Sequence, residues 1–189
     1  MEFSRIDEAD ATALRHILGG IDRAEHVDVQ YVVLDDRLTT APVKMVDVPA
    51  WRDDDGPHSV GRLTRFSVGM VERGGVTLVA HDGPSVAGIV IVVPEFEPPL
   101  AWLGLLHVSR PHRRQGVASA LHGTAESISI AAGATSMYVS ASPTGSAVGF
   151  YLSRGYELAT PPHPALFELE PDDVHLVLDL SRSPEGASS

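Results

Sequence analysis

The chain has 189 residues, of which 43% are hydrophobic and 21% charged, with a formal net charge of −11 and no cysteine. This length and composition predict one globular domain, expected over residues 1–182, with a disordered tail over 183–189. The acidic balance argues against nucleic-acid partners, which require a basic face, and the lack of cysteine excludes disulfides, thiolate metal ligands and a cysteine nucleophile.

The lengths of the apolar runs and the composition of the amino terminus predict the cellular location of the protein. No run approaches 18 apolar residues, and the first residues lack a basic region followed by an apolar core. Neither a membrane span nor a signal peptide is therefore predicted. A cytoplasmic location without a membrane partner is expected.

The first predicted elements are a strand and a helix. Residues 3–6 predict an edge strand. Apolar residues over 11–18 predict a helix that Asp7 or Asp10 would cap and that ends at a glycine pair.

Residues 35–61 form an irregular region that follows an apolar run of uncertain type over 30–34. Prolines and the acidic triplet 53–55 interrupt it. It is too long for an inert connection in a compact domain. It is therefore either a functional loop or a place where short elements leave no pattern.

The middle of the chain predicts a helix and then a β-hairpin. Leu63, Phe66 and Met70 recur at helical spacing. Apolar strands are predicted over 76–81 and 85–93, joined by an Asp-Gly turn.

A buried strand over residues 100–108 and the helix after it are the central elements. The strand is apolar and too short for a helix, and Arg110 and Pro111 end it. Apolar residues then recur at three- and four-residue steps from Val117 to about Gly133, which predicts an amphipathic helix. The remaining predicted elements are a strand over 136–140, a helix over 146–154, a strand over 156–160, a proline-rich interruption over 161–164 and a closing strand over 175–180.

The turn between the central strand and its helix predicts a phosphate site. A helix start presents unpaired N–H groups and the positive end of the peptide dipole, and Gly116 would let an anion approach them. Arg113 and Arg114 add fixed positive charge. The ligand would be a phosphate or pyrophosphate, and the alternative is a solvated basic turn.

Two segments carry a resemblance to a known family. Arg113-x-x-Gly116-x-Ala118 matches the pattern Arg/Gln-x-x-Gly-x-Gly/Ala and resembles motif A of the GNAT acyltransferase superfamily. The segment from Thr144 to Gly155-Tyr156 resembles the family's Asn-x-x-Ala-x-x-x-Tyr-x-x-x-Gly-Phe/Tyr pattern, with Thr144 in place of Asn. The resemblance covers about residues 60–180.

The resemblance implies a fold and a co-substrate. The expected fold is α/β, with a mixed, mostly antiparallel central sheet flanked by helices and two central strands that splay apart to admit the pantetheine arm of coenzyme A. Residues 35–61 would form one wall of the acceptor site. Dimers are common in the superfamily, so a homodimer is one option, and no interface stripe in the sequence decides the oligomeric state. Residues expected to bind acetyl-CoA are Leu106, His107, Val108, Arg113, Arg114, Gln115, Gly116, Val117, Ala118, Ser119, Thr144 and Phe150.

The resemblance also implies a catalytic acid, Tyr151, which would face the departing sulfur; the alternative is a half-buried aromatic packed beside Phe150. The base is harder to place. Many relatives carry Glu or His on the central strand on the face of Val108, and a period of two gives that face only Trp102, Gly104 and Leu106, none of which accepts a proton.

Several residues remain candidates for the general base or for contacts to the acceptor. His107 has the opposite parity on the strand, Glu95 and Glu97 would act through water, and Ser140 would hold such a water. Trp102 either lines the acceptor tunnel or packs in the core. The last connection is either a solvated acidic loop or an acceptor wall, and its candidates are Glu168, Glu170, Asp172, Asp173 and His175.

The function expected is acetyl-CoA-dependent transfer of an acetyl group to a primary amine of a small molecule by direct attack. Two alternatives are a non-catalytic acyl-CoA-binding regulatory module and an acetyltransferase acting on protein N-termini or lysines. No metal is expected, because the nine histidines form no ligand spacing such as His-x-x-x-His.

Overall fold

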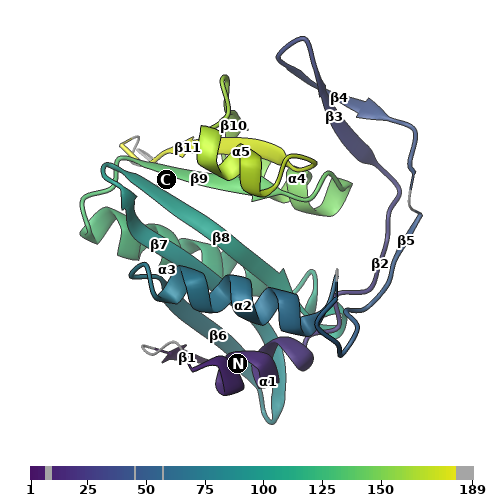
Figure 1. The fold of residues 1–189 in the computed structure, drawn as a ribbon, viewed down its shortest axis with the longest axis vertical. Helices are drawn as coiled ribbons and strands as arrows, with labels where there is room; N and C mark the ends of the chain where they lie inside the picture. The colour runs from purple at the N-terminus through teal and green to yellow at the C-terminus, as the bar shows by residue number, and fades with distance from the viewer. Residues whose placement is uncertain (7–9, 45, 57, 182–189) are drawn as a thin grey trace, which may run out of the picture.

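The computed structural model describes residues 1–6, 10–44, 46–56 and 58–181, and its centre is a seven-stranded sheet (Figure 1). The strand order is β1-β6-β7-β8-β9-β11-β10, and every neighbouring pair is antiparallel except β8 with β9. The mixed, mostly antiparallel fold that was predicted is therefore confirmed. The strands are β1 (Glu2–Ile6), β6 (Val76–Asp82), β7 (Ser85–Glu97), β8 (Leu100–Val108), β9 (Ser136–Ala141), β10 (Glu157–Leu158) and β11 (Val174–Asp179).

Helices cover both faces of the sheet. The helices α1 (Ala11–Gly19) and α2 (Val60–Val71) lie on one face and α3 (Val117–Ala131) on the other (Figure 1). Each face has its own apolar cluster, since Leu18 and Ile91 pack on the α1 and α2 side and Leu121 and Val90 on the α3 side. The sheet is thus the middle of three layers.

Local chemistry explains where the helices begin and how closely they pack. Asp10 caps α1 by accepting hydrogen bonds from two backbone N–H groups, whereas Asp7 lies outside the described residues. Ser59 caps α2, so that helix begins before its first periodic apolar residue. Gly88 lets α3 rest on β7, because a Cβ there would come within 3.2 Å of Val117 and 3.1 Å of Leu121.

The apolar run over 30–34 is a strand, and the irregular region over 35–61 holds short strands, which was one of its two expected interpretations. Residues 25–44 and 46–48 form a projecting arm made of β2 (Glu25–His26), β3 (Gln30–Leu34), β4 (Arg37–Ala41) and β5 (Asp47–Val48) (Figure 1). These strands are very short or largely exposed, so they carry no alternation of buried and exposed residues.

The acidic triplet of the same region anchors the helices. Asp53 and Asp55 both pair with Arg15 of α1, and Asp55 also pairs with Arg65 of α2. The charges that interrupt the sequence pattern therefore hold the loop against the two helices.

The carboxy-terminal elements differ from the prediction in detail. A short helix, α4 (Gly145–Leu152), follows β9, and a further helix, α5 (Pro164–Leu169), begins at the last proline of the predicted interruption. Proline suits a first helical position because that residue needs no N–H donor. Among the described residues, no helix has the length and apolar character needed to cross a membrane.

Candidate active site

The strands β8 and β9 separate along their length. They pair in parallel only at three positions, from Leu100 with Ser136 to Trp102 with Tyr138. Beyond Trp102, the edge of β8 over 103–108 has no strand partner among the described residues. We call this region, with 139–141 of β9, the β8–β9 divergence.

A β-bulge at Gly104 changes which side chains share a face of β8. Ile91 of β7 lies opposite Leu105 and its neighbour Val92 lies opposite Leu103, which leaves Gly104 as an extra residue. The period-two expectation is therefore wrong beyond this point. Trp102 and Leu105 belong to the cluster on the α1 and α2 side, whereas Leu106 and Val108 pack on the α3 side.

Backbone groups of Leu106 and Val108 face the divergence. The Ser109 N–H donates to the Ala87 carbonyl of β7. Because the backbone N–H and C=O groups of successive residues point to opposite edges of a strand, those of Val108 and Leu106 point away from β7. The Val108 carbonyl accepts from Arg113 Nε at 3.1 Å. The remaining polar groups of this edge are available to an extended ligand.

The start of α3 is open to an anion. Gly116 is its N-cap residue with φ of 82°, and no side chain caps the helix within the described chain. No heavy atom lies within 4 Å of where its Cβ would be, apart from its chain neighbours and helix backbone. Arg114 is exposed and also has positive φ, at 62°. Of the other predicted residues, Gln115 is exposed and donates to the Pro111 carbonyl, Val117 is buried, Ala118 is partly buried and Ser119 is exposed.

Arg113 does not present its guanidinium to this open helix start. Its guanidinium donates to the carbonyls of Ala24 at 3.0 Å and Arg23 at 2.9 Å, in addition to Val108. The expectation of an Arg113 side chain on phosphate is corrected accordingly, because its donors bind backbone carbonyls.

These contacts fix one end of a segment that crosses the divergence, and we call residues 22–31 the strap. At the β8 end, Arg110 N–H donates to the Asp22 carbonyl at 2.7 Å. At the β9 end, Tyr31 N–H donates to the Pro143 carbonyl at 2.9 Å, and Gly145 N–H donates to the strap at Val29. The strap therefore joins the carboxyl ends of the two strands where they lie farthest apart.

Tyr151 is buried on the α3 side, in the same apolar cluster as Leu106 and Val108. Burial, followed by the carboxylates of Glu170 and Asp173, raises its pKa far above that of an ordinary phenol. Within the described residues, no group hydrogen-bonds its hydroxyl. Tyr151 is thus a protonated phenol close to acidic groups.

Thr144 and Phe150 complete the helix that carries Tyr151. Thr144 is the N-cap of α4 and accepts from Ala147 N–H, so the substitution of Thr for Asn keeps the capping function. Phe150 lies under Arg154, whose guanidinium carbon is 4.5 Å from the ring centroid. Arg154 also hydrogen-bonds Ser119 in the first turn of α3. No sequence pattern selects Arg154, which adds positive charge beside the helix start.

Two carboxyl groups of the last connection have perturbed pKa values. Burial and then Asp173 raise the pKa of Glu170 to about 7, while Ser140 and Arg62 oppose the rise. Burial and then Asp172 raise the pKa of Asp173 to about 6. The acidic-loop candidates therefore include one carboxyl group that titrates near neutral pH.

Other predicted residues occupy different surroundings. His107 packs edge-on against Trp51, and burial, Arg23 and Arg113 lower its pKa to about 4, which makes it a weak base. Glu97 is exposed and pairs with His163 at 3.1 Å. Glu168 lies exposed on α5.

Trp102 packs in the core on the α2 side. It is 2% exposed and contacts the rings of Phe66 and Phe96. Its Nε1 is buried without a hydrogen-bond partner in the described chain. The indole also lies against the bulge, since a Cβ on Gly104 would come within 2.9 Å of it.

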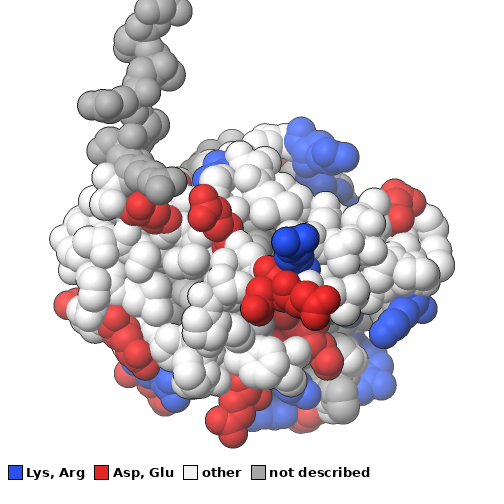
Figure 2. Space-filling model, turned by 90° about the horizontal axis from the view of Figure 1, so that it is seen from above, with Lys and Arg blue, Asp and Glu red and all other residues white. Residues whose placement is uncertain are grey.

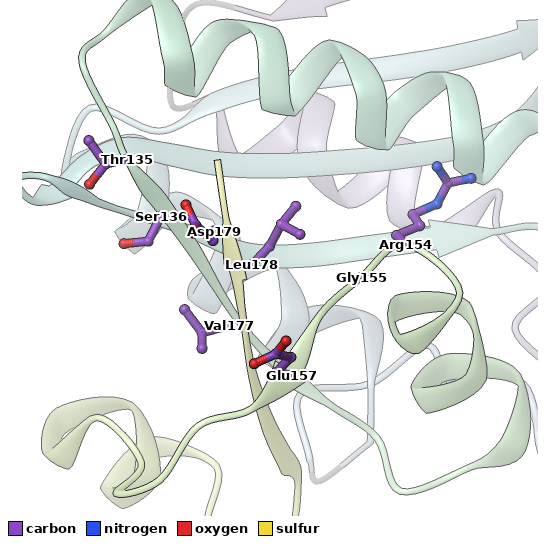
Figure 3. Close-up of a pocket in the computed structure, with 8 residues that line it drawn as sticks. All are labelled: Thr135, Ser136, Arg154, Gly155, Glu157, Val177, Leu178 and Asp179. Atoms are coloured by element: carbon purple, nitrogen blue, oxygen red, sulfur yellow. The ribbon is translucent and has the colours of Figure 1, made fainter. Parts of the chain in front are cut away.

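One open pocket of the structure lies away from these residues. It has a volume of about 430 Å³. In it, Arg154 lies close to α3, and Thr135 and Asp179 lie at the opposite end (Figure 3). None of the predicted site residues lines it. In the described parts of the chain, no cluster of three or more His, Asp or Glu side chains is arranged to hold a metal ion.

The family model of the acetyltransferase (GNAT) family matches residues 43–156, which is more than half of the chain. The chain belongs to the GNAT acetyltransferase family. The match includes both segments on which the resemblance was based, so that prediction is confirmed. No curated protein matches the chain.

Solved acetyltransferase structures share the GNAT fold of this chain. Nourseothricin acetyltransferase superposes with a TM-score of 0.63 at 18% identity, covering 95% of this chain and 98% of that one. Aminoglycoside 6′-acetyltransferase type Ii gives 0.60 at 14% identity, covering 97% and 100%. A Bacillus anthracis protein assigned as a streptothricin acetyltransferase, solved in complex with acetyl coenzyme A, gives 0.58 at 13% identity, covering 83% and 86%.

Proposed function

We propose that this GNAT domain transfers an acetyl group from acetyl-CoA to a primary amine of a small molecule. The observation that carries the proposal is the β8–β9 divergence, with the backbone groups of Leu106 and the Val108 N–H at its edge and the open start of α3 at its wide end. These are the groups that a pantetheine arm and a pyrophosphate require.

Acetyl-CoA fits the residues that are present. The N–H groups at the start of α3 would hold the pyrophosphate, with Arg114 and Arg154 as nearby cations. The edge of β8 would pair with the amide groups of pantetheine, and Tyr151 would lie at the thioester sulfur. When bound, acetyl-CoA supplies an activated acyl group with a thiolate leaving group.

A small amine is favoured as the acceptor for two reasons. The strap crosses the wide end of the divergence, which favours an enclosed site over the open groove that a protein acceptor needs. The carboxylates of Glu170 and Asp173 also act on Tyr151, and Figure 2 shows Asp and Glu side chains, with Lys or Arg among them, near the middle of the face seen from above. An acidic surface attracts a cationic amine and speeds its encounter with the site. The neighbours named for nourseothricin, streptothricin and aminoglycosides suggest acceptors to test first.

Calorimetry with acetyl-CoA, followed by thiol release with a panel of primary amines, tests the proposed function. The panel contains nourseothricin, an aminoglycoside and simple alkyl diamines. Binding together with amine-dependent thiol release is expected. Binding without release on any amine would point instead to a regulatory acyl-CoA-binding module, and lack of binding would overturn both functions.

Replacing Tyr151 with Phe tests the leaving-group role. We expect kcat to fall about 10- to 100-fold, because the thiolate loses its hydrogen-bond donor, while acetyl-CoA affinity stays within twofold. The Tyr156→Phe variant removes another buried hydroxyl of the same cluster and serves as the control. Undiminished kcat in Tyr151→Phe would remove Tyr151 from the mechanism.

A further inference from the structure

Ser140 of β9 and His175 of β11 form a hydrogen-bonded pair at the β8–β9 divergence. The two residues lie directly opposite each other in the register of these strands, so their side chains share one face of the sheet. His175 Nδ1 lies 3.3 Å from Ser140 Oγ, and His175 Nε2 lies 3.1 Å from the Glu170 carbonyl oxygen. The imidazole also contacts the rings of Tyr138 and Phe167, at centroid distances of 5.8 Å and 5.4 Å. Its orientation is thus fixed at both nitrogens and by two aromatic neighbours.

These hydrogen bonds determine where the protons of the pair lie. A carbonyl oxygen only accepts, so His175 Nε2 carries a hydrogen. Burial lowers the pKa of His175 below its ordinary value, so at neutral pH the imidazole is uncharged and Nδ1 is an acceptor. The Ser140 hydroxyl therefore donates its single hydrogen to Nδ1. Its oxygen keeps its lone pairs, which can accept a hydrogen bond from an amine N–H.

Ser140 and the proposed acid, Tyr151, lie on opposite faces of the sheet. Strands β8 and β9 stop pairing after Trp102 and Tyr138, and Ser140 follows two residues later on β9. Because a strand alternates its side chains, Ser140 shares the face of Tyr138, which packs on the α1 and α2 side, whereas Tyr151 packs on the α3 side. Ser140 is partly exposed, while His175 behind it is only 3% exposed. A thioester in the divergence would therefore meet a proton acceptor from one face and a proton donor from the other.

Other titratable groups surround this pair. Tyr138 of β9 contacts the imidazole, and burial raises its pKa, so it is a phenol that keeps its proton at neutral pH. Glu170 and Asp173 are on the connection after α5, where burial raises the pKa of their carboxyl groups to about 7 and about 6, and Arg62 of α2 acts on Glu170. The Glu170 carboxyl group is accordingly the rival proton acceptor that an experiment has to distinguish from His175.

We infer that Ser140 accepts the proton of the attacking amine nitrogen while it passes its own proton to His175, and we call these two residues the proton relay. This inference rests on the proposed function and supplies the base that the central strand lacks. Ser140 is the catalytic residue that contacts the amine. His175 is the positioning residue that orients the Ser140 hydroxyl and holds the proton behind it.

The proton transfers balance over one turnover. The neutral amine nitrogen bonds to the thioester carbonyl carbon, one N–H proton moves to Ser140 Oγ, and the Ser140 proton moves to His175 Nδ1. The carbon–sulfur bond then breaks, and Tyr151 donates a proton to the departing thiolate. His175 releases its proton to water through Ser140, and Tyr151 regains one from water. A neutral amine and a thioester thus give an amide and a thiol.

Turnover of the best amine of the panel by variants of the pair tests the proton relay. Ser140→Ala and His175→Asn should each lower kcat about 10²-fold or more, while acetyl-CoA affinity stays within about twofold. Asparagine keeps an oxygen that can accept from Ser140 but cannot take up a proton, so His175→Asn separates proton transfer from orientation. The double variant should be within about threefold of the slower single variant, because the two residues act as one unit.

Two further variants of β9 are matched controls. Ser140→Thr keeps the hydroxyl on a β-branched residue that suits a strand, so its kcat should be within about tenfold of wild type. Ser136→Ala removes another hydroxyl on the same face of β9, and its kcat should not change. Equal losses in Ser140→Thr and Ser140→Ala, or losses that multiply in the double variant, would indicate a role limited to folding and would overturn the proton relay.

The histidine tautomer gives a readout that does not depend on turnover. In ¹⁵N-labelled protein at neutral pH, the His175 resonances, identified by their loss in His175→Asn, should show a hydrogen on Nε2 and none on Nδ1. A hydrogen on Nδ1 would contradict the proton relay.

The outcomes separate this inference from the proposed function. If wild type turns over amines and Ser140→Ala and His175→Asn keep its rate, the proton relay is overturned while the acetyltransferase function stands. The same conclusion follows if Glu170→Gln removes the rate and His175→Asn does not. If wild type releases no thiol with any amine, both fall.

Discussion

Glu170 is held where its ionised form destabilises the fold. Its pKa of about 7 lies above the ordinary value of 4.5, so the folded protein binds this proton more tightly than the unfolded chain does. The resulting stability is fully present below about pH 4.5 and is lost as pH rises through 7. At pH 8 the protein therefore contains a partly buried carboxylate that opposes folding.

Glu170→Gln should consequently stabilise the protein in a pH-dependent way. We expect its free energy of unfolding at pH 8 to exceed that of wild type by an amount of the order of 2 kcal/mol, with little difference at pH 4.5. Urea denaturation at both pH values measures this. Equal differences at the two pH values would show that packing, and not charge, is responsible.

Single residues show where sequence reasoning was limited. Arg113 was selected for its charge, but charge does not tell which acceptors a guanidinium will meet, and the strap carbonyls come from residues about ninety positions away. Glu170 was one of several acids in a region that reads as a solvated loop. Its raised pKa comes from burial and from Asp173, which no local pattern reveals.

At the scale of elements, the anion-binding role proposed for Gly116 at the start of α3 can be tested separately from its effect on stability. Gly116→Ala would strain a left-handed residue by about 1 kcal/mol and place a methyl group where the anion approaches. We expect acetyl-CoA affinity to fall at least tenfold. Isothermal titration calorimetry measures the loss.

Gly133 beyond the other end of α3 provides the matched control. Its φ of 88° resembles the 82° of Gly116, and neither has a neighbouring atom within 4 Å of the added Cβ. Gly133→Ala should therefore cost similar stability while leaving affinity unchanged. An equal loss of affinity in both variants would mean that strain, and not the open helix start, explains the effect.

Helices and strands were predictable where their burial against the core gives the sequence a periodic pattern of apolar residues. Strand β8 and helix α3 followed from an apolar run and a three- and four-residue repeat, because both pack against the core. The bulge at Gly104 left no such trace, and it reversed the faces of Leu106 and Val108. The arm was missed because two-residue strands and exposed ones have no periodic signal.

For the whole molecule, Arg113 is one of the residues that connect the strap to the end of β8. Arg113→Gln would leave strap carbonyls without their donors, and we expect a loss of about 2–4 kcal/mol in unfolding free energy. Hydrogen exchange over residues 22–31 should accelerate. Denaturation and exchange mass spectrometry measure the two effects.

Arg114→Gln supplies the contrasting variant one residue away. Arg114 is exposed, so stability should change by less than about 0.5 kcal/mol. Its acetyl-CoA affinity should fall and depend less on salt concentration, because one phosphate-attracting charge is gone. A loss of stability in Arg114→Gln, together with a loss of acetyl-CoA affinity but not of stability in Arg113→Gln, would contradict the roles assigned to these arginines.

The strap is anchored largely through its own backbone atoms, and at the β8 end the Asp22 carboxylate also pairs with Arg110 at 3.0 Å. The carbonyls of Asp22, Arg23 and Ala24 and the backbone of Val29 and Tyr31 make the contacts, and every amino acid provides a carbonyl. Substitutions along it can therefore accumulate while its path is preserved. For the proposed function, this means that strap residues other than Asp22 can change without moving the start of α3 or Tyr151.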